Sequence, residues 1–168
     1  MGKVKKGLCV IGITVPIIFI LTYIHPRRVQ SEYNGFMYRI GDNNYAENIK
    51  VIVDGYFSNG LLRGDKFKGN ITIGNKELIK VDVEFDELNR GHLFSYEEGD
   101  YSFYGTIFEK NKLEEFTIGI YEENEAGGKG WSTKGGLMVS APAMNRERAV
   151  SLSNLLMKDI LINETQIH

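Results

Sequence analysis

Two patterns of apolar residues divide the chain: one unbroken run near its start, then alternating apolar and polar positions. The run extends from Gly7 to Ile24 without a charged residue. As a helix it would measure about 27 Å, close to the thickness of a bilayer core. Lysines precede the run, and Arg27 and Arg28 follow it, so both ends carry groups that avoid hydrocarbon. The pattern predicts a transmembrane anchor at residues 7–24, behind a short basic N-terminus at residues 1–6.

A cleaved signal peptide and a buried helix of a soluble domain are the alternative interpretations of this run. A cleavage site needs small residues shortly after the run, and Leu21 to Arg28 offers none of the A-x-A kind. Pro16 would break a soluble helix, whereas membrane-spanning helices tolerate proline. Cys9 lies at the start of the run, whereas the cysteine of a lipoprotein follows it. We therefore expect an uncleaved signal-anchor.

The basic residues on either side of the span predict its orientation. Three lysines and the α-amino group precede it and two arginines follow it, which favours a cytoplasmic N-terminus. We expect a single-pass protein of the cell membrane whose C-terminal domain is extracytoplasmic, with residues 25–35 as a polar stalk. The opposite orientation, with the domain in the cytoplasm, is the alternative.

From residue 36 onwards the chain shows the period of two that is typical of strands with one buried face. Ile49, Val51 and Val53 alternate with polar residues, and the stretch 79–86 behaves in the same way. Two segments also repeat at a constant offset, each predicting a strand, a polar turn and a second strand. The repeated residues are Phe67, Gly69, Ile71, Asn75, Lys76 and Phe85, then Phe103, Gly105, Ile107, Asn111, Lys112 and Tyr121.

Near its C-terminus the chain changes to a helical pattern. Apolar residues from Arg146 to Ile162 cover about half of the helical circumference, and Asn145 is a suitable N-cap. We expect a helix over about residues 144–162. Its apolar side should pack on three aromatic residues that we expect on one side of the sheet: Tyr104, Phe108 and Tyr121.

These patterns together predict a mainly β domain of the α+β class over residues 36–163. We expect an antiparallel meander or small barrel-like sheet of about seven to nine strands, closed by the C-terminal amphipathic helix. Residues 164–168 would form a short tail.

The charge of the domain limits its partners. From Gln30 onwards there are fifteen lysines and arginines against twenty-two acids, so the formal charge is −7. Such a surface repels nucleic acid and anionic lipid headgroups, which excludes nucleic acid as a partner and leaves lipid contact to the N-terminal helix. No cysteine follows Cys9, so the domain has neither a disulfide nor a thiolate metal site.

Motifs that would indicate catalysis are absent from the sequence. His92 is the only histidine between His25 and the terminal residue, and there is no G-x-S-x-G or H-E-x-x-H motif. The glycine-rich stretch 126–136 lacks the Gly-Lys-Ser/Thr ending of a phosphate loop. An acidic strand face carries the oxygen ligands that calcium prefers, although a solvated face is the simpler interpretation. Its residues are Asp82, Glu84 and Asp86. We predict no catalytic residue, no cofactor and no metal site.

Aromatic residues are the candidate contacts that remain: Trp131, Tyr104 and Tyr121. Trp131 is the single tryptophan, and aromatic side chains give a large contact area at a small entropic cost. We therefore expect a non-catalytic binding or interaction module, anchored in the membrane, for a partner protein or a small ligand. The alternatives are an accessory or inhibitory subunit of another membrane protein and a carboxylate-based hydrolase.

Overall fold

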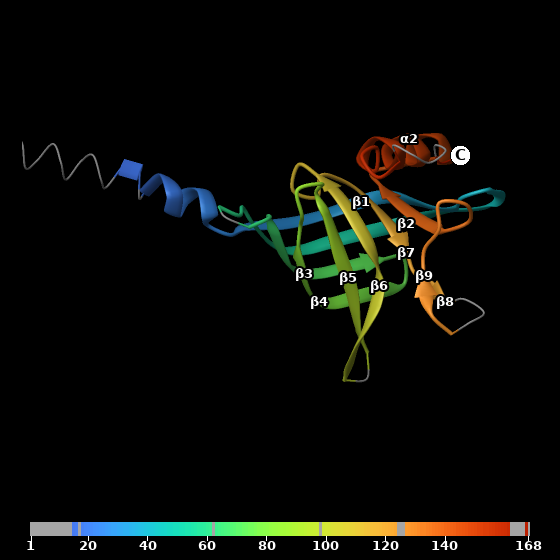
Figure 1. The fold of residues 1–168 in the computed structure, drawn as a ribbon, viewed down its shortest axis with the longest axis horizontal. Coiled ribbons are helices and arrows are strands. Elements are labelled where there is room, and N and C mark those ends of the chain that lie inside the picture. The colour runs from blue at the N-terminus through green and yellow to red at the C-terminus, as the bar shows by residue number, and fades with distance from the viewer. Residues whose placement is uncertain are drawn as a thin grey trace, which may run out of the picture.

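The computed structural model describes residues 15, 16, 18–61, 63–97, 99–123, 127–161 and 167. Most of its strands belong to one sheet (Figure 1). In order along the chain, its elements are β1 (Arg27–Arg39), β2 (Asp42–Ser58), β3 (Lys66–Ile73), β4 (Lys76–Glu84), β5 (Arg90–Glu97), β6 (Asp100–Lys110), β7 (Glu115–Ile120), β8 (Glu122–Glu123), β9 (Lys129–Gly130), β10 (Leu137–Ala141) and α2 (Arg146–Leu156).

The main sheet is antiparallel throughout, with its strands in the order β4-β3-β2-β1-β10-β7-β6-β5. Strand β1 pairs with both β2 and β10, which joins the two halves of the chain, and the whole sheet is curled into a nearly closed barrel (Figure 1). The two end strands, β4 and β5, are joined by a turn in which the Asp86 N–H donates to the Arg90 carbonyl at 2.9 Å. The predicted antiparallel, barrel-like sheet with a C-terminal helix is confirmed.

Alternate residues of the strands point into the barrel and form one apolar core. On β2, for example, Val51, Val53 and Phe57 are buried. A barrel of eight strands leaves an interior just wide enough for side chains or one small ligand. Here large side chains fill it, among them Phe57, Phe67 and Phe116, each at most 2% exposed.

The turn between β6 and β7 contains a buried carboxylate. Asn111, Lys112 and Leu113 have φ values of 56°, 62° and 70°, a region that few residues other than glycine adopt. Oε2 of Glu109 accepts a hydrogen bond from the Leu113 N–H at 3.0 Å, and the Leu113 side chain lies in the core. Burial raises the pKa of Glu109. These two contacts hold the unusual backbone of the turn.

The first strand begins earlier than the sequence pattern predicted. We expected a stalk at residues 25–35, but β1 starts at Arg27 and pairs with β2 along its whole length. Tyr33 packs against the core, and outside the barrel Arg28 forms an ion pair with Asp54 at 3.1 Å. The polar residues that resembled a linker are therefore the outward-facing residues of a strand.

Helix α2 packs on the outer side of the sheet, over β1, β7 and β10. It starts after the N-cap Asn145, whose Oδ1 accepts a hydrogen bond from the Arg148 N–H at 2.9 Å. The regular helix ends at Leu156, earlier than the expected residue 162. Its buried residue Ala149 belongs to a second apolar cluster that also contains Phe108 of β6.

Four hydroxyl groups meet beneath the helix, and all four side chains are 0% exposed: Tyr38, Thr117, Ser140 and Ser153. The Tyr38 hydroxyl donates to Oγ of Ser153 at 2.8 Å. Oγ of Ser153 also lies 2.8 Å from Oγ1 of Thr117 and 2.9 Å from Oγ of Ser140. Burial raises the pKa of Tyr38. The helix is therefore docked by hydrogen bonds as well as by apolar contacts.

The N-terminal helix leaves the barrel at the start of β1 (Figure 1). Residues 15, 16 and 18–24 of it are described and are helical, whereas 7–14 and 17, the rest of the predicted span, lie outside the described residues. Its large apolar side chains are exposed, for example Ile18 at 63% and Phe19 at 71%. Within the described part of the chain, no helix has the length and apolar character needed to cross a membrane.

Candidate functional site

The outer surface of β1 to β4 is covered by cross-strand ion pairs. They are Arg28–Asp54 at 3.1 Å, Lys50–Glu32 at 2.7 Å, Lys66–Glu84 at 2.9 Å and Lys68–Asp82 at 2.7 Å. Each carboxylate faces a cation on the neighbouring strand, which is typical of a solvated face. This side of the barrel is therefore polar and electrically balanced.

Of the acidic residues that the sequence suggested for calcium, Asp82 and Glu84 take part in these pairs, and Asp86 pairs with Arg90 at 2.8 Å. Hydrogen bonding to Lys66 lowers the pKa of Glu84. For Asp86, burial acts to raise the pKa, but hydrogen bonds from the Arg90 and Leu88 N–H groups and the Arg90 guanidinium bring it below its usual value. Among the described residues, no group of three or more His, Cys, Asp or Glu is arranged to hold a metal ion.

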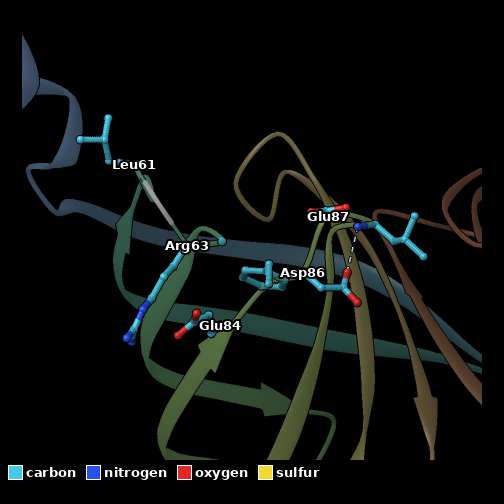
Figure 2. Close-up of a pocket in the computed structure, with 8 residues that line it drawn as sticks. Leu61, Arg63, Glu84, Asp86 and Glu87 are labelled. Carbon is cyan, nitrogen blue, oxygen red and sulfur yellow. Dashed lines mark hydrogen bonds between the residues drawn. The ribbon is translucent and has the colours of Figure 1, made fainter.

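An open hollow lies at the end of the barrel from which the N-terminal helix leaves, between the loop that carries Leu61 and Arg63 and the turn after β4 (Figure 2). Its acidic lining includes Glu84 and Asp86, both already paired with cations. A general acid needs a carboxyl that keeps its proton near neutral pH. The lowered pKa values of these two carboxyls do not favour that role.

The outer surface of β5, β6 and β7 is different, because aromatic side chains lie across it. We call this surface the aromatic face; it consists of His92, Phe94, Tyr96, Tyr101, Phe103 and Tyr121. Phe103 lies at its centre, with ring centroids 4.7 Å from Phe94, 5.3 Å from His92 and 5.0 Å from Tyr121. Tyr96 and Tyr101 form a further pair at 4.8 Å. Cross-strand pairing thus joins these rings into one surface.

Part of the aromatic face is open to solvent. Phe94 is 40% exposed and Tyr101 is 56% exposed. The Phe103 and Tyr121 rings are stacked with an interplanar angle of 29°, whereas Phe94 meets Phe103 edge-on at 69°. The helix α2 lies over β1, β7 and β10 and reaches β6 at Phe108, so no helix of the described chain covers these rings. The face is therefore a contiguous, accessible aromatic surface.

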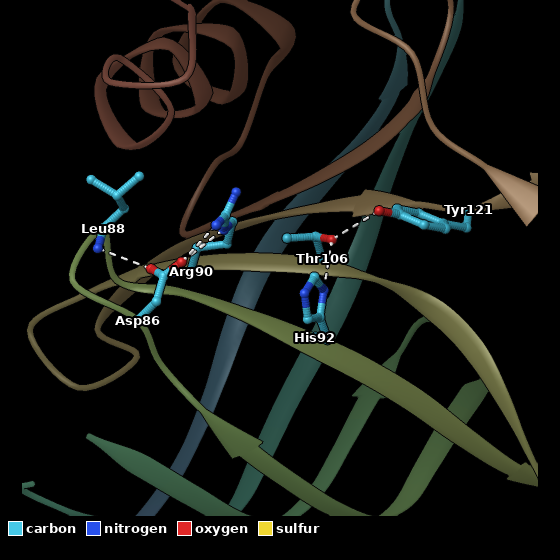
Figure 3. Close-up of polar contacts among 6 residues, drawn as sticks. All are labelled: Asp86, Leu88, Arg90, His92, Thr106 and Tyr121. Atoms are coloured by element: carbon cyan, nitrogen blue, oxygen red, sulfur yellow. Dashed lines mark hydrogen bonds and ion pairs between the residues drawn. The ribbon is translucent and has the colours of Figure 1, made fainter. Parts of the chain in front are cut away.

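Polar groups run through the aromatic face. Oγ1 of Thr106 lies 3.4 Å from Nδ1 of His92 and 3.3 Å from the Tyr121 hydroxyl (Figure 3). Both distances are at the long end of the hydrogen-bond range. The His92 ring and the Tyr121 hydroxyl therefore keep capacity to bond a group that approaches from outside.

A register shift explains why these rings face outwards together. On β5 and β6, Leu93 pairs with Gly105 and Phe94 with Phe103, so Tyr104 is an extra residue between the two pairs. Phe103 therefore points outwards, whereas Tyr104 packs against the core inside the barrel. Burial raises the pKa of Tyr104 to about 12. Our expectation that Tyr104 shares a face with Phe108 beneath the helix is wrong, because the bulge reverses its side.

Trp131 lies beside the aromatic face and not within it. A Cβ added to Gly119 would lie 3.1 Å from Nε1 of Trp131, and one added to Gly136 would lie 2.3 Å from the same atom. The indole thus rests on two glycines, next to the apolar cluster under the helix. Its Nε1 is buried and has no hydrogen-bond partner among the described residues. Gly119 precedes Tyr121 by two residues on the outer side of β7, so Trp131 covers the adjoining position.

The structure thus separates the three candidate contacts. Tyr121 belongs to the aromatic face, Trp131 flanks it, and the Tyr104 side chain lies within the barrel. We had not predicted Phe94 and Phe103 at the face, although the sequence contains a signal for them. Phe94-Ser95-Tyr96 and Tyr101-Ser102-Phe103 are mirror images about a turn, and each residue pairs with its image.

No protein-family model, no curated protein and no solved structure matches this chain. Fold and site together define an eight-stranded antiparallel barrel with one ion-paired outer face, one face covered by a helix and one exposed aromatic face.

Proposed function

We propose that the protein is a non-catalytic, membrane-anchored binding module whose aromatic face binds a partner protein. The observation that carries this proposal is the exposed row of rings centred on Phe103, on a barrel whose other outer faces are ion-paired or covered by α2. Exposed aromatic clusters are typical of protein interfaces, where Tyr, Trp and Phe are enriched.

The charge of the domain indicates the chemistry of the partner. A formal charge of −7 from Gln30 onwards favours a basic protein surface over an acidic one. Ring faces also attract cations, and Nζ of Lys80 already lies 4.4 Å from the centroid of the Tyr96 ring. We infer a partner that presents lysine or arginine side chains to the rings.

The N-terminal helix supports the anchoring part of the proposal. Its exposed residues include Val15, Ile18 and Phe19, a row of apolar side chains that a bilayer would bury. The lysines before the helix favour a cytoplasmic N-terminus and hence an extracytoplasmic barrel. An accessory or inhibitory subunit is the special case in which the partner is another protein of the same membrane.

Photo-crosslinking in intact cells tests the proposal. A photoreactive phenylalanine replaces Phe94 in one variant and Tyr56 in a control; Tyr56 is also an exposed aromatic residue, at 53%, but lies on the ion-paired outer side of β2. We expect one discrete protein adduct from position 94 and none from position 56. Phe103→Ala should abolish that adduct, and raising the salt concentration should weaken it. Equal adducts from both positions, or an adduct indifferent to Phe103→Ala, would contradict the proposal.

A further inference from the structure

The loop between β2 and β3 lies against the end of the N-terminal helix. The side-chain amide of Asn59 donates a hydrogen bond to the Tyr23 carbonyl at 2.8 Å. Leu61, two residues later, points out of the barrel beside this helix (Figure 2). The loop and the helix are therefore adjacent because a specific bond joins them.

Leu61 extends the apolar surface of the helix. Its side chain is 55% exposed, although leucine is usually buried, and Leu21 on the helix is 58% exposed. Ile18 and Leu21 also line a shallow hollow with Arg27, at the junction of the helix and β1. Single exposed leucines are common, but one that continues an exposed apolar helix belongs to a larger surface.

Two exposed cationic residues are close in the chain to the helix and to Leu61. Arg27 comes three residues after Ile24, the last helical residue, and Arg63 is two residues after Leu61; both are exposed. Acids also lie at this end of the barrel, including Glu84 and Asp86 of the neighbouring hollow. The mixed charge suits zwitterionic headgroups, where a guanidinium can bond the phosphate, and gives no reason to prefer anionic lipids.

We propose that the loop tip is a second membrane contact: Leu61 inserts at the boundary of headgroups and acyl chains, and Arg27 and Arg63 bond lipid phosphates. This inference rests on the anchoring part of the proposed function. Interfacial apolar side chains reach about 5–10 Å into this boundary. The contact would give the barrel a second point of attachment to the membrane, beside the N-terminal helix.

The test uses the full chain in phosphatidylcholine vesicles, with Cys9→Ser removing the native thiol. Leu61→Cys carries an environment-sensitive fluorophore in one sample. Leu155→Cys carries it in the control, because Leu155 is likewise an exposed leucine, at 49%, but lies on α2. Brominated lipids quench fluorophores that touch the acyl chains, and Trp131 emission checks that both variants fold alike.

We expect strong quenching at position 61, most with bromine near the headgroups, and none at position 155. Adding anionic lipid should leave the quenching at position 61 unchanged. If the protein floats with the vesicles but position 61 is quenched no more than position 155, the loop contact is overturned and the anchor stands. If the protein does not float with the vesicles, the anchor itself fails, and the loop contact fails with it.

Discussion

The hydroxyl cluster beneath α2 leads to a quantitative prediction for Ser153→Ala. Oγ of Ser153 contacts three other buried hydroxyls, at 2.8, 2.8 and 2.9 Å. Thr117 and Ser140 would still bond each other at 2.9 Å after the substitution, but Tyr38 would lose its acceptor at 2.8 Å and keep only the weaker interaction with Ser140. A buried hydroxyl with no partner costs about 1–3 kcal/mol, and the poorly bonded Tyr38 hydroxyl costs part of that in addition to the lost bonds of Ser153. Because serine and alanine differ little in volume, no cavity adds to this cost, and we expect a loss of about 2 kcal/mol.

A double-mutant cycle separates the cost of leaving the Tyr38 hydroxyl poorly bonded from the net value of the hydrogen bond itself. Tyr38→Phe alone should cost about 1 kcal/mol, the net value of one hydrogen bond. In the double variant no phenol is left with an incomplete set of bonds, so the loss of the double variant should be about 1 kcal/mol smaller than the sum of the two single losses.

Urea unfolding followed by tryptophan emission measures these losses, since the single indole of Trp131 packs beside the helix. The control is Ser151→Ala, an exposed serine on the same helix, which has the same gain in helix propensity without the buried hydroxyl. Equal stability of the Ser153→Ala and Ser151→Ala variants, or additive behaviour in the cycle, would refute the argument that these hydroxyls dock the helix.

Three further predictions concern a carboxylate, a glycine and a helix cap. Burial raises the pKa of Glu109, so the folded chain binds this proton more readily than the unfolded chain, and the stability it contributes is lost as pH rises through the raised pKa. Urea unfolding of the wild type, followed from neutral pH down towards the ordinary pKa of glutamate, should therefore show stability growing relative to Glu109→Gln as pH falls, and parallel curves would contradict this. Gly136→Ala places a Cβ 2.3 Å from the indole nitrogen and should lower the free energy of unfolding by about 1–3 kcal/mol and shift the tryptophan emission to longer wavelength. Gly135→Ala places a Cβ with nothing within 4 Å and should change neither quantity. Asn145→Ala removes the N-cap of α2 and should cost about 1 kcal/mol in thermal unfolding, against no change for the exposed neighbour in Met144→Ala.

The sequence pattern was informative wherever alternation survives in the structure. Val51 and Val53 of β2 face the core as their period of two predicts, and the repeated segments are the β3–β4 and β6–β7 hairpins. Alternation describes one strand at a time, however, and says little about register. The single extra residue at Tyr104 moved its ring to the other side of the sheet, as a shift of one residue must.

Contacts between distant segments explain the other differences. The residues before position 36 read as a polar stalk because Arg28 and Glu32 are polar, and only their ion-pair partners on β2 reveal a strand. Trp131 packs against Gly119 and Gly136. The sequence alone did not indicate that these two glycines make room for the indole, because that depends on how the strands pair. The aromatic face could have been predicted from the sequence. The mirrored order of Phe94 to Tyr96 and Tyr101 to Phe103 indicates a hairpin in which each aromatic residue pairs with another.

Strand β1 connects the N-terminal helix to the barrel, and this arrangement has a mechanical consequence. A pull on the helix acts along the axis of β1, which is held by hydrogen bonds to β2 from Arg27 to Arg39 and to β10 from Phe36 to Arg39. Such a pull loads these bonds in shear, so that many must break together, whereas a pull across the strand would open them one at a time. Unfolding by force is governed by the rate of unfolding under load. Force applied through the N-terminal helix therefore acts in the direction in which the barrel resists unfolding best.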